Sequence, residues 1–159
     1  MTRTRGKIRL IARGVRRIYS RRAGHTEPFR LVRMTVSAGK SNLSLSEIVT
    51  LESFPRISED LQRTGYAYFL CEIADKLLPE GDVLVEPYRM TLEMLRQIND
   101  TENPRILHKP LTGFVNRLLM NLGFLAPGTV LSATDVIPTL ERITERSLKT
   151  PPVLRAFRL

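Results

Sequence analysis

Residues 43–60 decide the fold class of this chain; they read LSLSEIVTLESFPRISED. Up to Leu51, apolar and polar side chains mostly alternate, which is typical of a strand with one buried face. Pro55 ends that pattern, and Ser58 with the two acids after it is typical of the start of a helix. The sequence therefore predicts a change from strands to helices near residue 55.

Two further strands are predicted before this stretch. Residues 7–13 alternate between basic and apolar side chains, and residues 29–37 form a second run rich in apolar residues. Residues 38–42 are expected to form a hairpin turn, and the basic, glycine-bounded residues 14–24 a loop. Together these segments predict an antiparallel sheet or part of a small barrel.

Helices are predicted after the switch. Apolar residues there recur at helical spacing, and Gly123 stands where a helix-ending glycine belongs. The expected helices cover residues 58–78, 86–98, a stretch from Leu111 to Leu122, and about 132–146. Strands followed by helices predict an α+β fold, with a β domain over residues 1–54 and an all-α helical bundle over residues 55–159.

Positive charge is concentrated at the start of the chain. The 159 residues carry 25 Lys and Arg against 16 Asp and Glu, a net charge of +9. Residues 1–40 hold twelve basic side chains and one acid, Glu27, so their net charge is +11, whereas residues 41–159 have a net charge of −2. Ten of the twelve are Arg, whose planar guanidinium matches phosphate oxygens. This asymmetry predicts a surface that binds a polyanion, with a solvated basic arm without a specific partner as the alternative.

Several classes of protein are excluded by what the sequence lacks. No apolar run approaches the roughly 18 residues of a transmembrane helix, and no signal peptide follows the basic N-terminus, so we expect a cytoplasmic protein without a membrane partner. The one cysteine, Cys71, is predicted to be a buried core thiol, and His25 lies far in sequence from His108. We therefore expect neither an enzyme nor a bound zinc ion or other cofactor.

Four stretches of the chain occur in an order that a known family shares. They are residues 6–17 (GKIRLIARGVRR) with Ser20-Arg21 and Glu27-Pro28-Phe29, residues 52–56 (ESFPR) with Glu59-Asp60-Leu61, residues 77–81 (LLPEG), and residues 118–124 (LLMNLGF). This ordered set, which extends over nearly the whole chain, resembles the bacterial recombination mediator RecO.

The resemblance implies a non-enzymatic protein with an N-terminal oligonucleotide-binding (OB) barrel and a C-terminal helical domain. RecO-like proteins bind single- and double-stranded DNA, anneal complementary strands and, with RecR, help to load RecA onto DNA covered by single-strand binding protein. The residues suited to DNA binding are Arg5, Lys7, Arg13, Arg16, Arg17, Tyr19, Arg21 and Arg22. Their arginines would supply an electrostatic groove beside the sheet, and Tyr19 is a candidate for stacking on a base.

The same resemblance implies a second binding surface, on the helices. The family's partner there is the acidic, apolar C-terminal tail of single-strand binding protein. The basic residues available for it are Arg89, Arg96, Lys109 and Arg117.

The chain departs from the family at two places. Many members carry four zinc-binding cysteines after the leucine-rich helix, whereas residues 124–128 here lead into a segment without cysteine. Members also usually begin with about a strand and a half of barrel before the position of Thr2. We therefore expect no zinc lobe and an incomplete barrel, completed either by residues upstream of Met1 or by a partner such as RecR or a second copy.

Two other functions remain open from the sequence. One is a basic RNA-binding module of the ribosome-associated type, which a higher affinity for structured RNA than for single-stranded DNA would favour. The other is an interaction adaptor in which the helical half does the work, which would be favoured if deletion of residues 1–24 left the cellular role intact.

Overall fold

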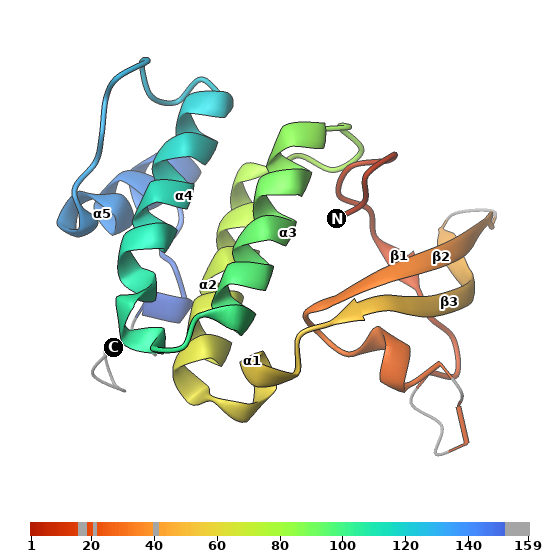
Figure 1. Cartoon of the computed structure of the whole chain (residues 1–159). Coiled ribbons are helices and arrows are strands. Elements are labelled where there is room, and N and C mark those ends of the chain that lie inside the picture. Colours follow the sequence, from red (N-terminus) through yellow and green to blue (C-terminus); the bar gives the residue numbers. More distant parts are fainter. Residues whose placement is uncertain (16–18, 21, 40–41, 152–159) are drawn as a thin grey trace. The chain divides into compact units, whose positions relative to one another are not determined.

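The computed structural model describes residues 1–15, 19–20, 22–39 and 42–151. It divides into two compact units, each of which we describe by itself. The sheet unit is Ile8–Phe54, and the helical unit combines Met1–Lys7 with the described residues from Pro55 onward. Strands come first along the chain and helices follow (Figure 1), so the predicted α+β class is confirmed.

The sheet unit is built on a long hairpin. Strand β2 (Arg30–Ala38) pairs antiparallel with β3 (Leu43–Ser53), and the amide of Gly39 donates to the carbonyl of Asn42 at 2.9 Å. The predicted turn between the strands includes residues 40–41, which lie outside the described residues. The described strands form one sheet in the order β1-β3-β2, which does not close into a barrel (Figure 1). The predicted incomplete, OB-like sheet is therefore present in this unit.

The first strand differs most from its prediction. Residues 7–13 predicted an antiparallel strand, but only Leu10–Ile11 form β1, and this strand pairs in parallel with the start of β3. The cause lies elsewhere in the chain. Lys7, the first residue of the predicted strand, instead forms a β-bridge with Glu80 within the helical unit, and its carbonyl accepts the amide of Gly81 at 2.9 Å.

Five α-helices and one 3₁₀ helix make up the described secondary structure of the helical unit. They are α1 (Pro55–Glu59), α2 (Leu61–Leu77), α3 (Val85–Asp100), η2 (Pro104–Leu107), α4 (His108–Asn121) and α5 (Ala133–Thr144). Helices α2 and α3 lie alongside each other, α4 contacts α3, and α5 contacts α4 (Figure 1).

The helix predicted over residues 58–78 is two helices. Asp60 adopts an extended backbone conformation between them, and its side chain accepts the amide of Arg63 at 2.9 Å. Asp60, and not Ser58, is therefore the N-cap of α2. The hydroxyl of Ser58 instead donates to the carbonyl of Pro55 at 2.8 Å within α1.

The apolar core of the helical unit comes from all its helices. Side chains that are less than 2% exposed include Ile57, Leu70, Ile73, Ile98, Leu107, Phe114, Val115, Leu118, Leu119 and Leu140. Four of the predicted apolar positions, Leu111, Phe114, Val115 and Leu118, form a buried stripe on α4, whereas Leu122 is the C-cap and is partly exposed. Gly123 follows with a φ of 79°, the left-handed conformation of a helix-ending glycine. The prediction for Cys71 is wrong, because this side chain lies on the exposed side of α2.

The first seven residues make a turn against the connection between α2 and α3. The amide of Thr2 donates to the carbonyl of Gly6 at 2.7 Å, and Gly6 has a φ of 61°. A Cβ atom added at Gly6 would lie 1.8 Å from the carbonyl oxygen of Asp82, so only glycine permits this approach. The Lys7 ammonium lies 3.3 Å from the Asp75 carboxylate of α2.

Candidate nucleic-acid interface

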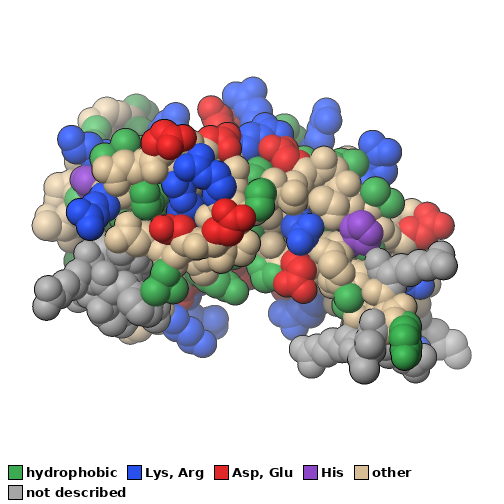
Figure 2. Space-filling view, turned by 60° about the horizontal axis from the view of Figure 1, so that its bottom comes forward, with side chains coloured by type: hydrophobic (Ala, Val, Ile, Leu, Met, Phe, Trp, Pro, Cys, Tyr) green, Lys and Arg blue, Asp and Glu red, His purple; other side chains and the backbone are tan. Residues whose placement is uncertain are grey.

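The two units differ in charge. Residues 8–54 hold nine basic and three acidic side chains, a net charge of +6, whereas residues 55–159 hold thirteen of each. On the face that Figure 2 shows, basic and acidic side chains lie interspersed. The excess positive charge of the chain therefore belongs to the sheet unit and to the turn at residues 1–7, which adds three basic residues.

Three of the predicted DNA-binding residues lie in the described part of the sheet unit. Arg13 and Arg22 are exposed at either end of the basic loop, and the Tyr19 side chain within it is 95% exposed. The Arg22 guanidinium donates a 3.3 Å hydrogen bond to the carbonyl of Leu45 on β3, which ties the end of the loop to the sheet. Arg16, Arg17 and Arg21 lie outside the described residues.

Two predicted residues belong to the other unit. Arg5 is exposed in the turn at residues 1–7, where its amide donates to the Thr2 hydroxyl at 3.0 Å. Lys7 donates to the backbone carbonyl of Asp75 and pairs with the carboxylate of the same residue. The Lys7 ammonium is therefore engaged in the folded helical unit, whereas the Arg5 side chain is exposed to solvent.

The sheet unit carries two further exposed cations that were not among the predicted DNA-binding residues. Arg30 and Arg33 are exposed on β2, and Arg33 stands opposite Val49, which is 57% exposed. Alternation with Met34 and Val36 indicated the exposure of Arg33, whereas Arg30 lies on the other side of a register shift between Leu31 and Val32 that strict alternation does not predict. The described strands of this unit carry no Trp, Tyr or Phe. The described aromatic side chains of the unit are Tyr19 and Phe29 in the loops and the buried Phe54.

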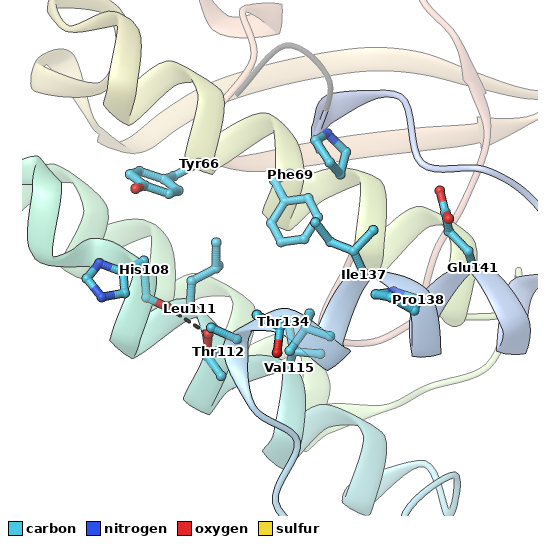
Figure 3. A pocket seen from close by; sticks show the side chains of 13 residues that line it. Tyr66, Phe69, His108, Leu111, Thr112, Val115, Thr134, Ile137, Pro138 and Glu141 are labelled. Carbon is cyan, nitrogen blue, oxygen red and sulfur yellow. Dashed lines mark hydrogen bonds between the residues drawn. The ribbon is translucent and has the colours of Figure 1, made fainter. Parts of the chain in front are cut away.

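The helical unit contains a pocket of about 500 Å³ between α2, α4 and α5. In Figure 3, Tyr66 and His108 lie at one end, Glu141 lies at the other, and Phe69 and Ile137 lie between them. The lining is mostly apolar, and burial raises the pKa of Tyr66 above its ordinary value.

Three of the polar side chains that line this pocket have hydrogen-bond partners. His108 Nδ1 lies 2.9 Å from the carbonyl of Arg105, and the Thr112 hydroxyl donates to the carbonyl of His108 at 2.9 Å (Figure 3). Glu141 accepts the amide of Leu148 at 2.8 Å.

Basic residues predicted for the helical surface lie outside the pocket lining. Arg89, Arg96, Lys109 and Arg117 are all exposed, but the described residues that line the pocket include no Lys or Arg. Arg89 pairs with Glu86 at 3.2 Å. Lys109 and Arg117 share α4 with four lining residues, so this helix combines a cationic outer side with one wall of the apolar pocket.

Two classes of site have no counterpart in the described part of the chain. No group of three or more His, Cys, Asp or Glu side chains is arranged there to hold a metal ion. None of the described helices has the length and hydropathy needed to cross a membrane.

Comparison with known proteins places both units in one family. The model of the N-terminal domain of recombination protein O matches residues 1–54, and that of its C-terminal domain matches residues 58–130. A protein of Symbiobacterium thermophilum named DNA repair protein RecO is 38% identical over 125 residues, which cover 78% of this chain and 48% of the relative.

Other relatives carry the same name. The protein of Listeria monocytogenes is 34% identical over 106 residues (67% of this chain, 42% of the relative), and that of Roseiflexus sp. is 33% identical over 94 residues (59% and 33%). The chain thus spans about half the length, or less, of the curated relatives it matches.

Proposed function

The chain belongs to the RecO family, and from that premise we propose that it is a DNA-binding mediator of recombination and repair and not an enzyme. In this proposal it acts in the cytoplasm, binds single- and double-stranded DNA and promotes annealing of complementary strands. With RecR, it helps to load RecA onto DNA covered by single-strand binding protein. The observation that carries the proposal is the concentration of positive charge in the sheet unit, beside a helical sequence of no net charge.

The sheet unit is the part that we assign to DNA. Arg13 and Arg22 are exposed at the ends of the basic loop, and Arg16, Arg17 and Arg21 supply three more guanidinium groups to the same segment. Such a cluster binds phosphates without reading the bases, and it screens the repulsion between two strands that anneal. Tyr19, whose side chain is 95% exposed, adds a surface on which a base can stack.

The turn at residues 1–7 has a mixed role in this proposal. Arg5 is exposed and contributes a further phosphate contact. Lys7 was also a candidate, but its ion pair with Asp75 favours a structural role over a DNA contact.

We assign protein partners to the helical unit. An acidic, apolar tail such as that of single-strand binding protein would place apolar side chains in the pocket between α2, α4 and α5. Its carboxylates would then pair with exposed Lys109 and Arg117 on α4. What supports this assignment is that one helix carries both the apolar wall and the exposed cations.

The DNA part is tested by fluorescence anisotropy with single-stranded and duplex oligonucleotides of equal length. We expect both to bind, with an affinity that falls on the order of a hundredfold between 50 and 200 mM salt, because arginine-phosphate contacts release counterions. Complementary labelled strands should also anneal faster with the protein than without it. An absence of DNA binding at micromolar protein and low salt would contradict the proposal, as would a markedly higher affinity for structured RNA.

The partner-protein part is tested with a fluorescent tail peptide. We expect salt-sensitive binding that weakens about threefold to tenfold in the double variant Lys109→Glu, Arg117→Glu, since each exposed ion pair contributes less than about 1 kcal/mol. The matched control is Arg142→Glu, Arg146→Glu, which makes the same charge change at exposed residues in and just after α5. Equal affinity of both double variants for the peptide would remove Lys109 and Arg117 from the docking surface.

A further inference from the structure

A short 3₁₀ helix anchors the end of the basic loop to the sheet. This element, η1 (Gly24–Thr26), begins two residues after Arg22 and contacts both β2 and β3. Within it, Nδ1 of the His25 ring lies 2.8 Å from the hydroxyl oxygen of Thr50 and 3.3 Å from the backbone nitrogen of Thr50. One ring nitrogen thus meets two groups of a single β3 residue.

The chemistry of Thr50 fixes the role of that nitrogen. A backbone amide only donates, so Nδ1 must be the acceptor and the ring proton must lie on Nε2. Because Nδ1 carries no proton, the Thr50 hydroxyl also acts as a donor in the 2.8 Å contact. Both His25 and Thr50 are partly buried, where a backbone amide without an acceptor is costly.

The same helix is bonded directly to Arg22. The amide of His25 donates to the carbonyl of Arg22 at 3.1 Å, and the amide of Arg22 donates to the hydroxyl of Ser20 at 3.3 Å. The Arg22 guanidinium makes its own bond to the carbonyl of Leu45 on β3. The segment from Arg22 to His25 is therefore fixed to β3 at two positions, Leu45 and Thr50.

We infer that His25 is a positioning residue for DNA binding: its ring, by accepting two hydrogen bonds from Thr50, holds the C-terminal end of the basic loop on β3 and sets the place from which Arg22 meets phosphate. His25 needs no contact with DNA for this role, which rests on the proposed function of the sheet unit. The role differs from that of an extra cation, since Nδ1 acts as a hydrogen-bond acceptor in both contacts with Thr50.

Four substitutions distinguish the loss of the hydrogen-bond acceptor from a change in side-chain size. His25→Leu removes the acceptor, whereas His25→Asn retains one, because the Asn amide oxygen lies as many bonds from Cβ as Nδ1 does. Thr50→Val removes the hydroxyl donor and keeps the size of the side chain. Thr35→Val is the matched control, because the Thr35 hydroxyl bonds only an exposed Glu47 side chain at 3.4 Å elsewhere on the sheet.

The experiment measures two quantities for each variant: hydrogen exchange at the Thr50 amide without DNA, and affinity for single-stranded DNA at fixed salt. His25→Leu should speed the exchange by about tenfold and weaken DNA binding by about fivefold, the typical effect of one lost hydrogen bond. Thr50→Val should weaken DNA binding by a smaller factor. His25→Asn should keep most of the DNA affinity and most of the protection of the Thr50 amide, and Thr35→Val should match the unchanged chain.

The outcomes distinguish this role from the proposed function. If the unchanged chain does not bind DNA, the proposed function fails, and amide exchange still reports whether the anchor exists. If the unchanged chain binds DNA but His25→Leu binds equally well, the positioning role is wrong and the proposed function stands. If His25→Leu does not fold, the DNA affinities of His25→Asn and Thr50→Val test the role instead. A loss of affinity in His25→Asn that equals or exceeds the loss in Thr50→Val would overturn the role of the acceptor.

Discussion

The helical unit holds most of the buried apolar side chains and has little net charge, whereas the sheet unit buries few apolar side chains and is strongly basic. Of the twenty-two buried apolar side chains in the described residues, only Leu45 and Phe54 belong to the sheet unit, and the other twenty belong to the helical unit. Residues 8–54 have a net charge of +6, whereas residues 55–159 have none. Burial of apolar surface stabilises folds, and unpaired cations bind polyanions. We therefore propose that the helical unit supplies most of the stability and the sheet unit most of the affinity for DNA.

The largest effect on stability is expected at Arg63 in α2. Its guanidinium is buried and donates to the backbone carbonyls of Ile98 at 2.6 Å, Asn99 at 3.1 Å and Glu102 at 3.3 Å, at the end of α3. Arg63→Met should lower the free energy of unfolding by about 3 kcal/mol, because it leaves buried acceptors without donors. Urea denaturation followed by circular dichroism measures this change.

The control for that prediction lies in the other unit. Arg33→Met makes the same substitution at an exposed position of β2 and should change the free energy of unfolding by less than about 0.5 kcal/mol, while weakening DNA binding. If both variants lost equal stability, the contrast between the two units would be wrong.

A smaller loss is expected at Gly6. An alanine there would have to keep a φ of 61° and would place its Cβ 1.8 Å from the backbone oxygen of Asp82. Gly6→Ala should therefore release the turn at residues 1–7 and cost about 1–2 kcal/mol, the penalty for left-handed backbone in a residue with a side chain. Gly113→Ala, where an added Cβ meets nothing within 4 Å, should cost nothing by the same thermal or urea assay. A loss in Gly113→Ala as large as in Gly6→Ala would show that the clash with Asp82 is not the cause.

The helical unit should also lose some stability in acid through Glu72. Partial burial alone would raise the pKa of this carboxyl, but hydrogen bonds from the Lys149 amide and from Thr150, together with the Lys76 ammonium, lower its pKa below the ordinary value. Since the pKa is lower in the folded state, the stabilisation is fully present above the ordinary pKa of a glutamate and is lost as pH falls through the folded value.

The Glu72→Gln variant measures that contribution. It should be less stable than the unchanged chain by about 1 kcal/mol at pH 7, a typical cost for a lost capping acceptor, and the difference should shrink as the pH is lowered below 4. A difference that is constant from pH 7 to pH 3 would show that Glu72 acts through packing and not through its charge.

Local patterns in the sequence were sufficient for much of the fold. The hairpin of β2 and β3 and the buried stripe of α4 with Gly123 follow from residues close together in the chain, where periodicity and turn chemistry are decisive. Within the site, Tyr19 and Arg22 could be proposed because the loop is crowded with like charges that favour an exposed position.

Features that depend on distant pairs could not be predicted. The contacts of Lys7 with Glu80 and Asp75 join segments about seventy residues apart. The parallel pairing of β1 with β3 depends on the topology of the sheet. The sequence does not distinguish Arg63 from an exposed helix residue, because the carbonyls that it binds at the end of α3 are more than thirty residues away in the chain. Its burial, and the anchor between His25 and Thr50, needed the folded chain.

The assignment of DNA binding to the sheet unit is tested most directly by removing four positive charges from one unit or from the other and comparing the two variants. One variant replaces Arg16, Arg17, Arg21 and Arg22 by Ala, and its match replaces four exposed arginines of the helical unit, Arg89, Arg105, Arg142 and Arg146, by Ala. The measurement is affinity for single-stranded DNA against salt concentration. If about five loop arginines each neutralise one phosphate, the unchanged chain should show a slope of log affinity against log salt of roughly −3 to −4. The account predicts a slope near −1 for the loop variant and an unchanged slope for its match, and equal slopes for the two variants would contradict it.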